Sequence, residues 1–137
     1  MFGNDFVRDR NSFGVNALLN YGYSVLRSTV ARALVSSGLF PGIGIFHHNR
    51  SNAFPLADDI MEPYRPFVDK MVCALKNEMD IDEGLTRQIK ARLLGLPIVD
   101  VVINGCRSPL MNAVHQTTSS LVKCFNGERR KIIYPYL

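Results

Sequence analysis

Imidazole and carboxylate side chains gather in one stretch of the chain, IFHHNRSNAFPLADDIMEPYRP, residues 45–66. His47 and His48 stand together in a loop rich in Gly and Asn, although the whole chain contains only three histidines. An acidic cluster follows them, made of Asp58, Asp59 and Glu62. Imidazole nitrogens and carboxylate oxygens can hold a divalent ion such as Mg²⁺ or Mn²⁺, which keeps coordination positions free for phosphate oxygens.

The spacing of these residues suits phosphoryl-transfer chemistry. Asp59 and Glu62 are three residues apart, so on a helix they lie along one face. An ion held there, with an imidazole from the preceding loop, can activate a hydroxyl or water and offset charge at phosphorus. Zinc fits less well, because the chain has no HExxH motif and no thiolate pair. An exposed acidic first turn, favoured by the helix dipole, explains the carboxylates without a metal, and both interpretations stay open here.

The element before the histidine loop is expected to be a long helix. From Val15 onward, apolar residues recur at intervals of three and four, which predicts one buried face. That face consists of Val15, Leu18, Leu19, Leu26, Val30, Ala33 and Leu34. Gly38 is a typical C-cap. The connection that follows, residues 37–55, holds three glycines and two prolines, and loops of this length in a compact domain are usually functional or disordered.

The acidic cluster is predicted to open a second helix, from about Leu56 to Asn77. Pro63 and Pro66 fall in its interior, where each removes a backbone donor and bends the helix. The bend would turn the acidic first turn toward the histidine loop. After a break at MDIDEG, a short helix rich in Arg and Lys is expected over residues 85–94.

The last third of the chain mixes strand and helix signals. IVDVVINGC predicts a short strand that ends in an Asn-Gly turn. Ser108 and Pro109 predict a helix start, with Ser108 as the cap, and this helix would run to about Phe125, before Gly127. The tail RRKIIYPYL is basic and then extended. The fold class predicted from these elements is a mainly α-helical single domain.

Composition narrows the class of protein. The chain has 137 residues, 47% of them apolar and 20% charged, which is typical of one globular domain. Its formal charge of +4 permits an anionic partner such as nucleic acid without requiring one. Widely spaced Cys73, Cys106 and Cys124 indicate neither a disulfide framework nor a thiolate zinc site and favour a reducing cytoplasm. No apolar run reaches the roughly 18 residues of a membrane span, and the N-terminus does not have the pattern of a signal peptide.

Isolated cations could contact a phosphate backbone. Arg50 lies in the histidine loop, where a phosphate would approach. Arg65 could pair with Glu62, three residues before it, or contact DNA. A cluster suited to positioning phosphates without reading sequence consists of Arg87, Lys90 and Arg92.

Two other function classes fit parts of the pattern. A non-enzymatic helical interaction or DNA-binding module would use the acidic cluster as solubilising surface, and its partner binding would survive replacement of His47 and Glu62 by alanine. A helix-turn-helix DNA reader is disfavoured, because the connection around the histidines is far longer than the usual short turn. Competition with random-sequence duplex would identify such a reader.

Read as one string, the chain resembles the C-terminal helical domain of the CRISPR-associated integrase, the "Cas one" family. Members share an Asn-x-x-Leu-Asn-Tyr-Gly-Tyr helix, here residues 16–23, and a Gly-x-x-His step, here ending in His47. An Asp-x-x-Glu-x-x-Arg-Pro helix follows, here residues 59–66. Residues 101–135 resemble the version that accompanies type II (Cas-nine-type) systems. The similarity runs in one order from about Phe2 to Pro135.

The resemblance implies a metal-dependent DNA endonuclease and integrase of antiviral defence. Such an enzyme inserts foreign-DNA spacers into the CRISPR array by transesterification, in which a 3′-hydroxyl of the incoming DNA attacks a phosphodiester of the repeat. The implied cofactor is Mg²⁺ or Mn²⁺. The implied partners are double-stranded DNA of spacer and repeat, the companion "Cas two" protein, and a second copy in the family homodimer, all in the cytoplasm and away from membranes.

The same resemblance assigns roles to three residues of the opening stretch. His47 takes the place of the histidine ligand, with His48 as the alternative if the register of the loop shifts by one. Glu62 takes the place of the carboxylate ligand of the second helix. Asp59, one turn earlier, supports Glu62 or binds the ion nearby.

The resemblance also sets an expectation about what residues 1–137 correspond to. In the family, a first acidic ligand lies on a helix upstream of the matching region, and a β-rich dimerisation domain precedes it. The chain is therefore expected to correspond to the C-terminal helical, catalytic domain only. With His47 and Glu62 alone, one negative charge faces a divalent ion, so we expect weak metal binding and little or no integration by this chain. A tight, His47-dependent manganese site in a calorimetric titration would contradict this expectation.

Overall fold

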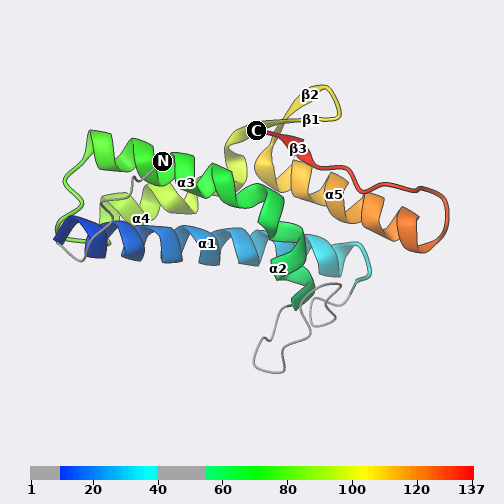
Figure 1. Cartoon of the computed structure of the whole chain (residues 1–137), viewed down its shortest axis with the longest axis horizontal. Coiled ribbons are helices and arrows are strands. Elements are labelled where there is room, and N and C mark those ends of the chain that lie inside the picture. Colours follow the sequence, from blue (N-terminus) through cyan, green and yellow to red (C-terminus); the bar gives the residue numbers. More distant parts are fainter. Residues whose placement is uncertain (1–9, 40–54) are drawn as a thin grey trace.

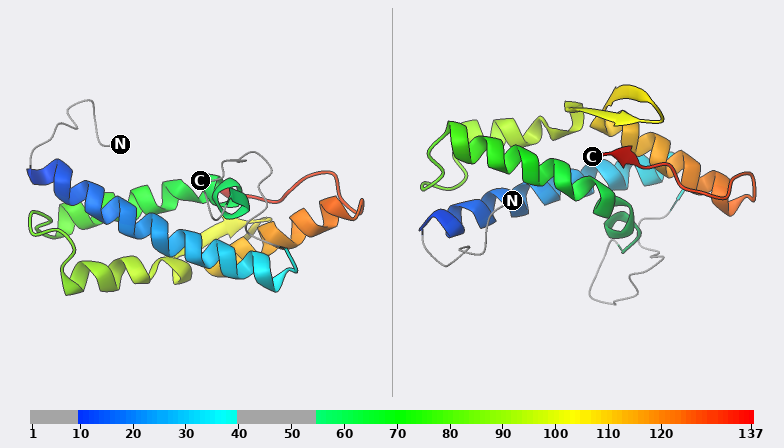
Figure 2. Two further views of the ribbon diagram at one scale, coloured as in Figure 1. Left: turned by 90° about the horizontal axis from the view of Figure 1, so that it is seen from below. Right: turned by 45° about the horizontal axis from the view of Figure 1, so that its top comes forward.

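Helix α1, Arg10–Ser36, is the long central element around which the rest of the fold packs (Figure 1). The computed structural model describes residues 10–39 and 55–137. In this part of the chain α1 contacts α2, α3, α4 and α5, which lie along its length on more than one side (Figure 2). The mainly α-helical class predicted from the sequence is confirmed.

The apolar face of α1 explains its central position. Six of the seven predicted positions are buried, and Leu19 is partly buried against the same core. The helix ends as its glycine predicts. Gly38 adopts φ +81°, and backbone hydrogen bonds from Gly38 N to Val35 O and from Leu39 N to Leu34 O close the last turn. This is the Schellman arrangement, which requires a left-handed residue and so favours glycine.

The predicted second helix forms as two α-helices with a turn of 3₁₀ helix between them. Helix α2 covers Pro55–Met61, the 3₁₀ turn η1 covers Glu62–Tyr64, and α3 covers Arg65–Glu78. Pro63 and Pro66 each occupy the first turn of a segment, where a missing N–H leaves no hydrogen bond unmade. The sequence therefore located the bend correctly, but the prolines start new segments instead of interrupting one helix.

Helix α1 and helix α3 approach closely at Gly22. A Cβ built on Gly22 would lie 2.6 Å from Cγ1 of Val68 on α3 and 3.6 Å from Cδ2 of Leu93. Leu93 belongs to α4, Arg87–Leu94. Because the absent side chain lets the backbone of α1 contact both neighbours, the glycine between the two tyrosines of the NYGY sequence serves packing.

Helix α4 begins two residues later than the sequence indicated. Thr86 is its N-cap, and the Thr86 hydroxyl accepts a hydrogen bond from the backbone N–H of Ile89 at 3.3 Å. A threonine hydroxyl satisfies a donor that the first turn of a helix otherwise leaves unpaired. Leu85 therefore precedes the helix, and its side chain is partly buried against the core.

A small antiparallel sheet follows the 3₁₀ turn η2, Leu96–Ile98. Strand β1, Asp100–Ile103, lies between β2, Cys106–Pro109, and β3, Pro135–Tyr136. The predicted Asn-Gly turn joins β1 to β2, with Asn104 at φ 54° and Gly105 at φ 78°, as a two-residue hairpin turn requires. The basic tail ends in β3, where Val102 pairs with Tyr136.

Helix α5, Leu110–Phe125, starts without the predicted serine cap. Ser108 belongs to β2 opposite Val101, and its hydroxyl donates to Pro109 O. The strand pairing outweighs the local cap signal because Leu110 N bonds to Val99 O across the hairpin at 2.7 Å. The helix end is as expected, with Gly127 at φ 75° just after it.

Among the helices of residues 10–39 and 55–137, none has both the length and the apolar character needed to cross a membrane.

Candidate functional site

The acidic cluster lies where α2 passes into η1, and its three carboxylates have different environments. Asp58 is 7% exposed, Asp59 is half-buried, and the Glu62 side chain is 53% exposed. The backbone stays helical from Asp59 through Met61 to Glu62, so the spacing of three places Asp59 and Glu62 on one side of the bend. This turn therefore exposes the Glu62 carboxylate to solvent, with the half-buried Asp59 carboxylate on the same side.

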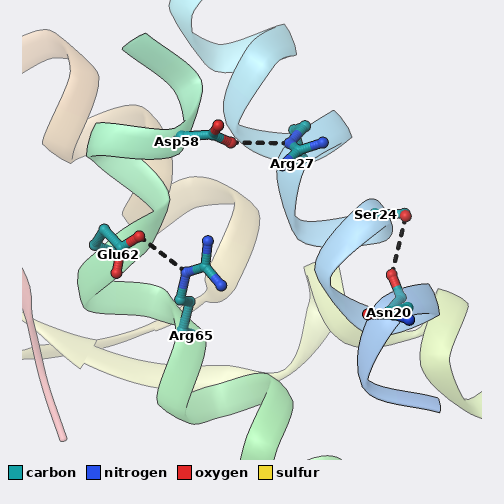
Figure 3. A network of polar contacts seen from close by, with 6 residues as sticks. All are labelled: Asn20, Ser24, Arg27, Asp58, Glu62 and Arg65. Atoms are coloured by element: carbon teal, nitrogen blue, oxygen red, sulfur yellow. Dashed lines mark hydrogen bonds and ion pairs between the residues drawn. The ribbon is translucent and has the colours of Figure 1, made fainter. Parts of the chain in front are cut away.

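Asp58 is bound from the central helix. The Arg27 guanidinium on α1 donates from Nε to Oδ1 of Asp58 at 2.9 Å (Figure 3). Arg27 is half-exposed whereas the Asp58 side chain is almost fully covered, so the pair fixes the start of α2 against α1 from the edge of the core. Asp58 and Asp59 make further interactions besides this one.

Glu62 is paired with the arginine one turn later. Arg65 Nε lies 3.1 Å from Oε1 of Glu62, and in Figure 3 the Arg65 side chain points toward that carboxylate. Nε is buried and lacks hydrogen-bond geometry toward any partner in the described residues, so the contact with Glu62 is an ion pair without a well-aligned hydrogen bond. The Arg65 guanidinium also lies over the Tyr23 ring, 5.0 Å from its centroid.

Tyr23 connects this arginine to α3. Its hydroxyl donates to Oδ1 of Asp69 at 2.5 Å. Burial, followed by the hydrogen bond to Asp69 and the charge of that carboxylate, raises the pKa of Tyr23 to about 12. Tyr23 thus stays neutral and keeps donating over the whole physiological range, which holds its ring under Arg65.

The histidine half of the predicted site falls outside the described residues, as do His48 and Arg50. Among residues 10–39 and 55–137, no group of three or more His, Cys, Asp or Glu side chains is placed to hold a metal ion. Asp59 and Glu62 are the predicted ligands that the structure does describe. Carboxylate oxygens of this kind suit a hard divalent ion.

Comparison with known proteins identifies the family. Residues 8–94 match the family described as "CRISPR associated protein Cas1", and this match includes α1, α2, α3 and α4. The chain belongs to the Cas1 family.

Two relatives among many show how much of a Cas1 protein the chain covers. It is 45% identical over 120 residues to the CRISPR-associated endonuclease Cas1 of Neisseria meningitidis. This alignment covers 88% of this chain and 39% of the relative. The chain is 35% identical over 109 residues to a Cas1 endonuclease of Pyrobaculum aerophilum, 80% of this chain and 37% of that protein. The chain thus spans about two fifths of the length of these curated relatives.

A solved structure shares the fold. The chain matches a casposase bound to integration product with a TM-score of 0.74 and 24% identity, over 86% of this chain and 37% of the other. The helical fold implied by the resemblance is therefore present, while the identity is too low to carry residue roles.

The cations predicted to contact DNA take different positions in this Cas1 fold. Arg87 and Lys90 are exposed on α4, which in Figure 1 lies along the N-terminal half of α1, whereas α2 lies against the C-terminal half. Arg92 Nη1 pairs with Oε2 of Glu78 at 2.8 Å. Among the predicted cations that the structure describes, this cluster therefore lies apart from the acidic turn, and Arg65 lies beside it.

Three residues around the acidic turn were not singled out from the sequence. They are Tyr23, Arg27 and Asp69. Tyr23 belongs to the NYGY sequence, whose two aromatic residues flank a glycine, and that pattern could have marked it as a contact point. No local signal pairs Arg27 with Asp58, because the two are 31 residues apart.

Proposed function

We propose that residues 1–137 form the metal-binding helical part of a Cas1 integrase, in which His47 and Glu62 hold Mg²⁺ or Mn²⁺ and Asp59, one turn before Glu62, supports that carboxylate. The observation that carries the proposal is the placement of the acidic turn: in a Cas1-family chain, Glu62 is exposed beside Asp59 while Asp58 is engaged by Arg27. The oxygen donors at this bend fit a hard divalent ion. When bound, that ion would activate a hydroxyl and offset negative charge on phosphorus.

The reaction proposed for the whole protein is transesterification. A 3′-hydroxyl of a short foreign DNA attacks a phosphodiester of the CRISPR repeat, a new phosphodiester forms, and a repeat 3′-hydroxyl leaves. In this reaction the chain's own residues would orient the DNA and the ligands. Arg27 fixes the start of α2 through Asp58, and Arg65 sits over Tyr23 next to Glu62, where it can also approach a phosphate.

The partners follow from the same proposal. Double-stranded DNA is supported by the fold shared with a casposase bound to integration product and by the endonuclease names of the relatives. Arg50, Arg65, Arg87, Lys90 and Arg92 remain the proposed DNA contacts. The companion "Cas two" protein, a second copy of the Cas1 protein, and a cytoplasmic location belong to the proposal as well.

Paramagnetic broadening by Mn²⁺ tests the metal site directly, because it detects weak as well as tight binding. We expect the backbone amide signals of residues 58–62 to broaden first on titration, and Glu62→Gln and His47→Ala to reduce that broadening. Glu83→Gln is the matched control, since it removes an equal charge from an exposed position outside the site. Broadening at residues 58–62 that Glu62→Gln leaves unchanged would overturn the assignment of Glu62.

Strand transfer of a labelled duplex into DNA carrying a CRISPR repeat tests the reaction. Residues 1–137 alone are expected to bind manganese weakly and to give little or no transfer, because His47 and Glu62 bring one formal negative charge against two. The competing interpretation, a non-enzymatic helical module, predicts instead that alanine at both positions leaves partner binding unchanged. Robust transfer by the chain alone would show that its ligand set is sufficient.

A further inference from the structure

The side of α5 that bears His115 holds a polar depression of about 340 Å³. Three segments line it: the β1–β2 turn with Asn104, one face of α5, and the loop after α5 with Arg129. The α5 residues used below are His115, Gln116, Ser119 and Lys123. Their spacing of three and four places them on one side of the helix. We call this feature the α5 depression.

The lining of the α5 depression has the chemistry of an anion site. Lys123 and Arg129 bring two permanent positive charges, and the amides of Asn104 and Gln116 and the hydroxyl of Ser119 add neutral hydrogen-bond donors. Among the described residues that line it, none is Asp or Glu. His115 is exposed at the same place.

Local structure holds the two edges of the depression in place. Gly127 reverses the chain after α5, with Glu128 N bonded to Lys123 O at 2.9 Å, so the following loop returns along the helix. Arg129 Nε donates to Lys131 O at 3.0 Å, which restricts the arginine while using one of its several N–H donors. Farther along, Ile133 N donates to Ser120 Oγ at 2.8 Å and ties the tail to α5.

The surroundings extend the positive charge. Arg130 and Lys131 are exposed next to Arg129, and Glu128 is the only acid between Lys123 and Lys131. The basic tail predicted from the sequence has no role in the phosphoryl-transfer site proposed at the acidic turn. The tail also links the two places, because Ile133 lines the depression and Tyr134, the next residue, is close enough to Asp59 to interact with its charge.

We propose that the α5 depression binds backbone phosphates of duplex DNA, as a contact site separate from the acidic turn. The identity of the ligand as DNA depends on the proposed function, whereas the anion site itself is inferred from the residues that line the depression. Lys and Arg side chains, together with neutral hydrogen-bond donors, contact phosphates and fix the position of a duplex without reading its sequence. Figure 1 shows the tail returning from the end of α5 toward the middle of the fold, so one duplex could contact both the depression and the acidic turn.

Fluorescence polarisation with a labelled random-sequence duplex, in EDTA and over a range of NaCl concentrations, tests the site. For Lys123→Ala/Arg129→Ala we expect weaker binding and a salt slope, log K against log[salt], reduced by about 1 to 2, since each neutralised phosphate contributes about 0.9. Lys70→Ala/Lys76→Ala removes the same charge from exposed positions on α3 and should keep the wild-type slope. Equal slope changes in both variants would overturn the proposal.

Two further arms locate the ligand. Amide shifts on adding duplex should be largest at Gln116, Ser119 and Lys123, and inorganic phosphate should compete only at much higher concentration. Tight phosphate binding without duplex binding would mean that the site serves a free anion, which contradicts the proposal. The duplex titration uses no metal, and the manganese experiment uses no DNA. If the manganese broadening is as expected but the salt slope of Lys123→Ala/Arg129→Ala equals that of the wild type, only the proposal for the α5 depression is rejected. The mutated side chains are exposed, and thermal unfolding would verify that the variants fold.

Discussion

The guanidinium of Arg65 lies over the ring of Tyr23, 5.0 Å from its centroid, and its Nε is 3.1 Å from Oε1 of Glu62. Tyr23 is on α1 and the other two residues are at the α2–α3 bend. The most exposed carboxylate of the candidate metal site is therefore positioned through the central helix. Tyr23 in turn is held by Asp69, so three side chains from two helices, Tyr23 on α1 and Arg65 and Asp69 on α3, determine where Glu62 points.

Removing the Tyr23 hydroxyl should weaken this network without dissolving it. Tyr23→Phe keeps the ring under Arg65 but loses the 2.5 Å hydrogen bond to Asp69. Because the acceptor is charged and the site is partly exposed, we expect a loss of about 1 kcal/mol in the free energy of unfolding. Urea denaturation measures it. Tyr136→Phe, at a position 65% exposed, is the control, and equal effects of the two substitutions would contradict the role of the hydrogen bond.

Arg65 should compete with a divalent cation for Glu62. The Arg65 and Glu62 side chains are 34% and 53% exposed, and such a pair contributes at most about 1 kcal/mol. Arg65→Gln is therefore expected to tighten Mn²⁺ binding by roughly two- to fivefold, with Arg87→Gln as a control of equal charge. Manganese titration followed by amide broadening gives both affinities. Unchanged or weaker binding in Arg65→Gln would mean that the arginine orients Glu62 more than it competes for it.

The Arg27–Asp58 pair should contribute to folding stability. Arg27→Ala removes one charged hydrogen bond, of 2.9 Å, from an almost fully covered carboxylate. We expect a loss of about 1–2 kcal/mol, and a smaller loss for Arg27→Lys, which keeps the charge. Arg32→Ala, at an exposed position five residues later on the same helix, should change stability little. Denaturant titration of the three variants decides, and the expectation fails if Arg27→Ala behaves like Arg32→Ala.

Local patterns predicted the parts of this fold that local chemistry determines. The apolar spacing of α1, Gly38 as its cap and the Asn104–Gly105 turn were all read correctly from neighbouring residues. Ser108 was misassigned because a cap signal and a strand residue look alike until the hairpin partner is known. Pairing over long separations cannot be read from local patterns. Tyr23 and Asp69 are 46 residues apart, and only the packing of α1 on α3 brings them together.

The close approach at Gly22 gives a packing prediction. Alanine normally favours a helix over glycine by up to about 1 kcal/mol, but here its Cβ would lie 2.6 Å from Val68 Cγ1. Gly22→Ala is therefore expected to destabilise the fold by about 1–3 kcal/mol as α1 and α3 separate. Ser28→Ala, exposed on α1, tests the helix propensity alone. Thermal unfolding of both variants measures the difference, and a stabilised Gly22→Ala would show that the contact yields easily.

Alkaline pH should destabilise the fold in part through Tyr64, in addition to Tyr23, whose pKa is also raised. This ring is fully buried, its hydroxyl is 2.7 Å from Thr117 Oγ1 on α5, and burial raises its pKa from 10.0 to about 12. Above pH 10 the unfolded chain loses the phenolic proton while the folded protein keeps it, so stability is complete below pH 10 and falls as pH rises toward 12. Tyr64→Phe should flatten that fall, although loss of the hydrogen bond lowers its stability at neutral pH. Urea titrations at pH 8 and pH 11 measure both effects. If Tyr64→Phe and wild type lose stability equally between these pH values, Tyr64 does not contribute to the loss.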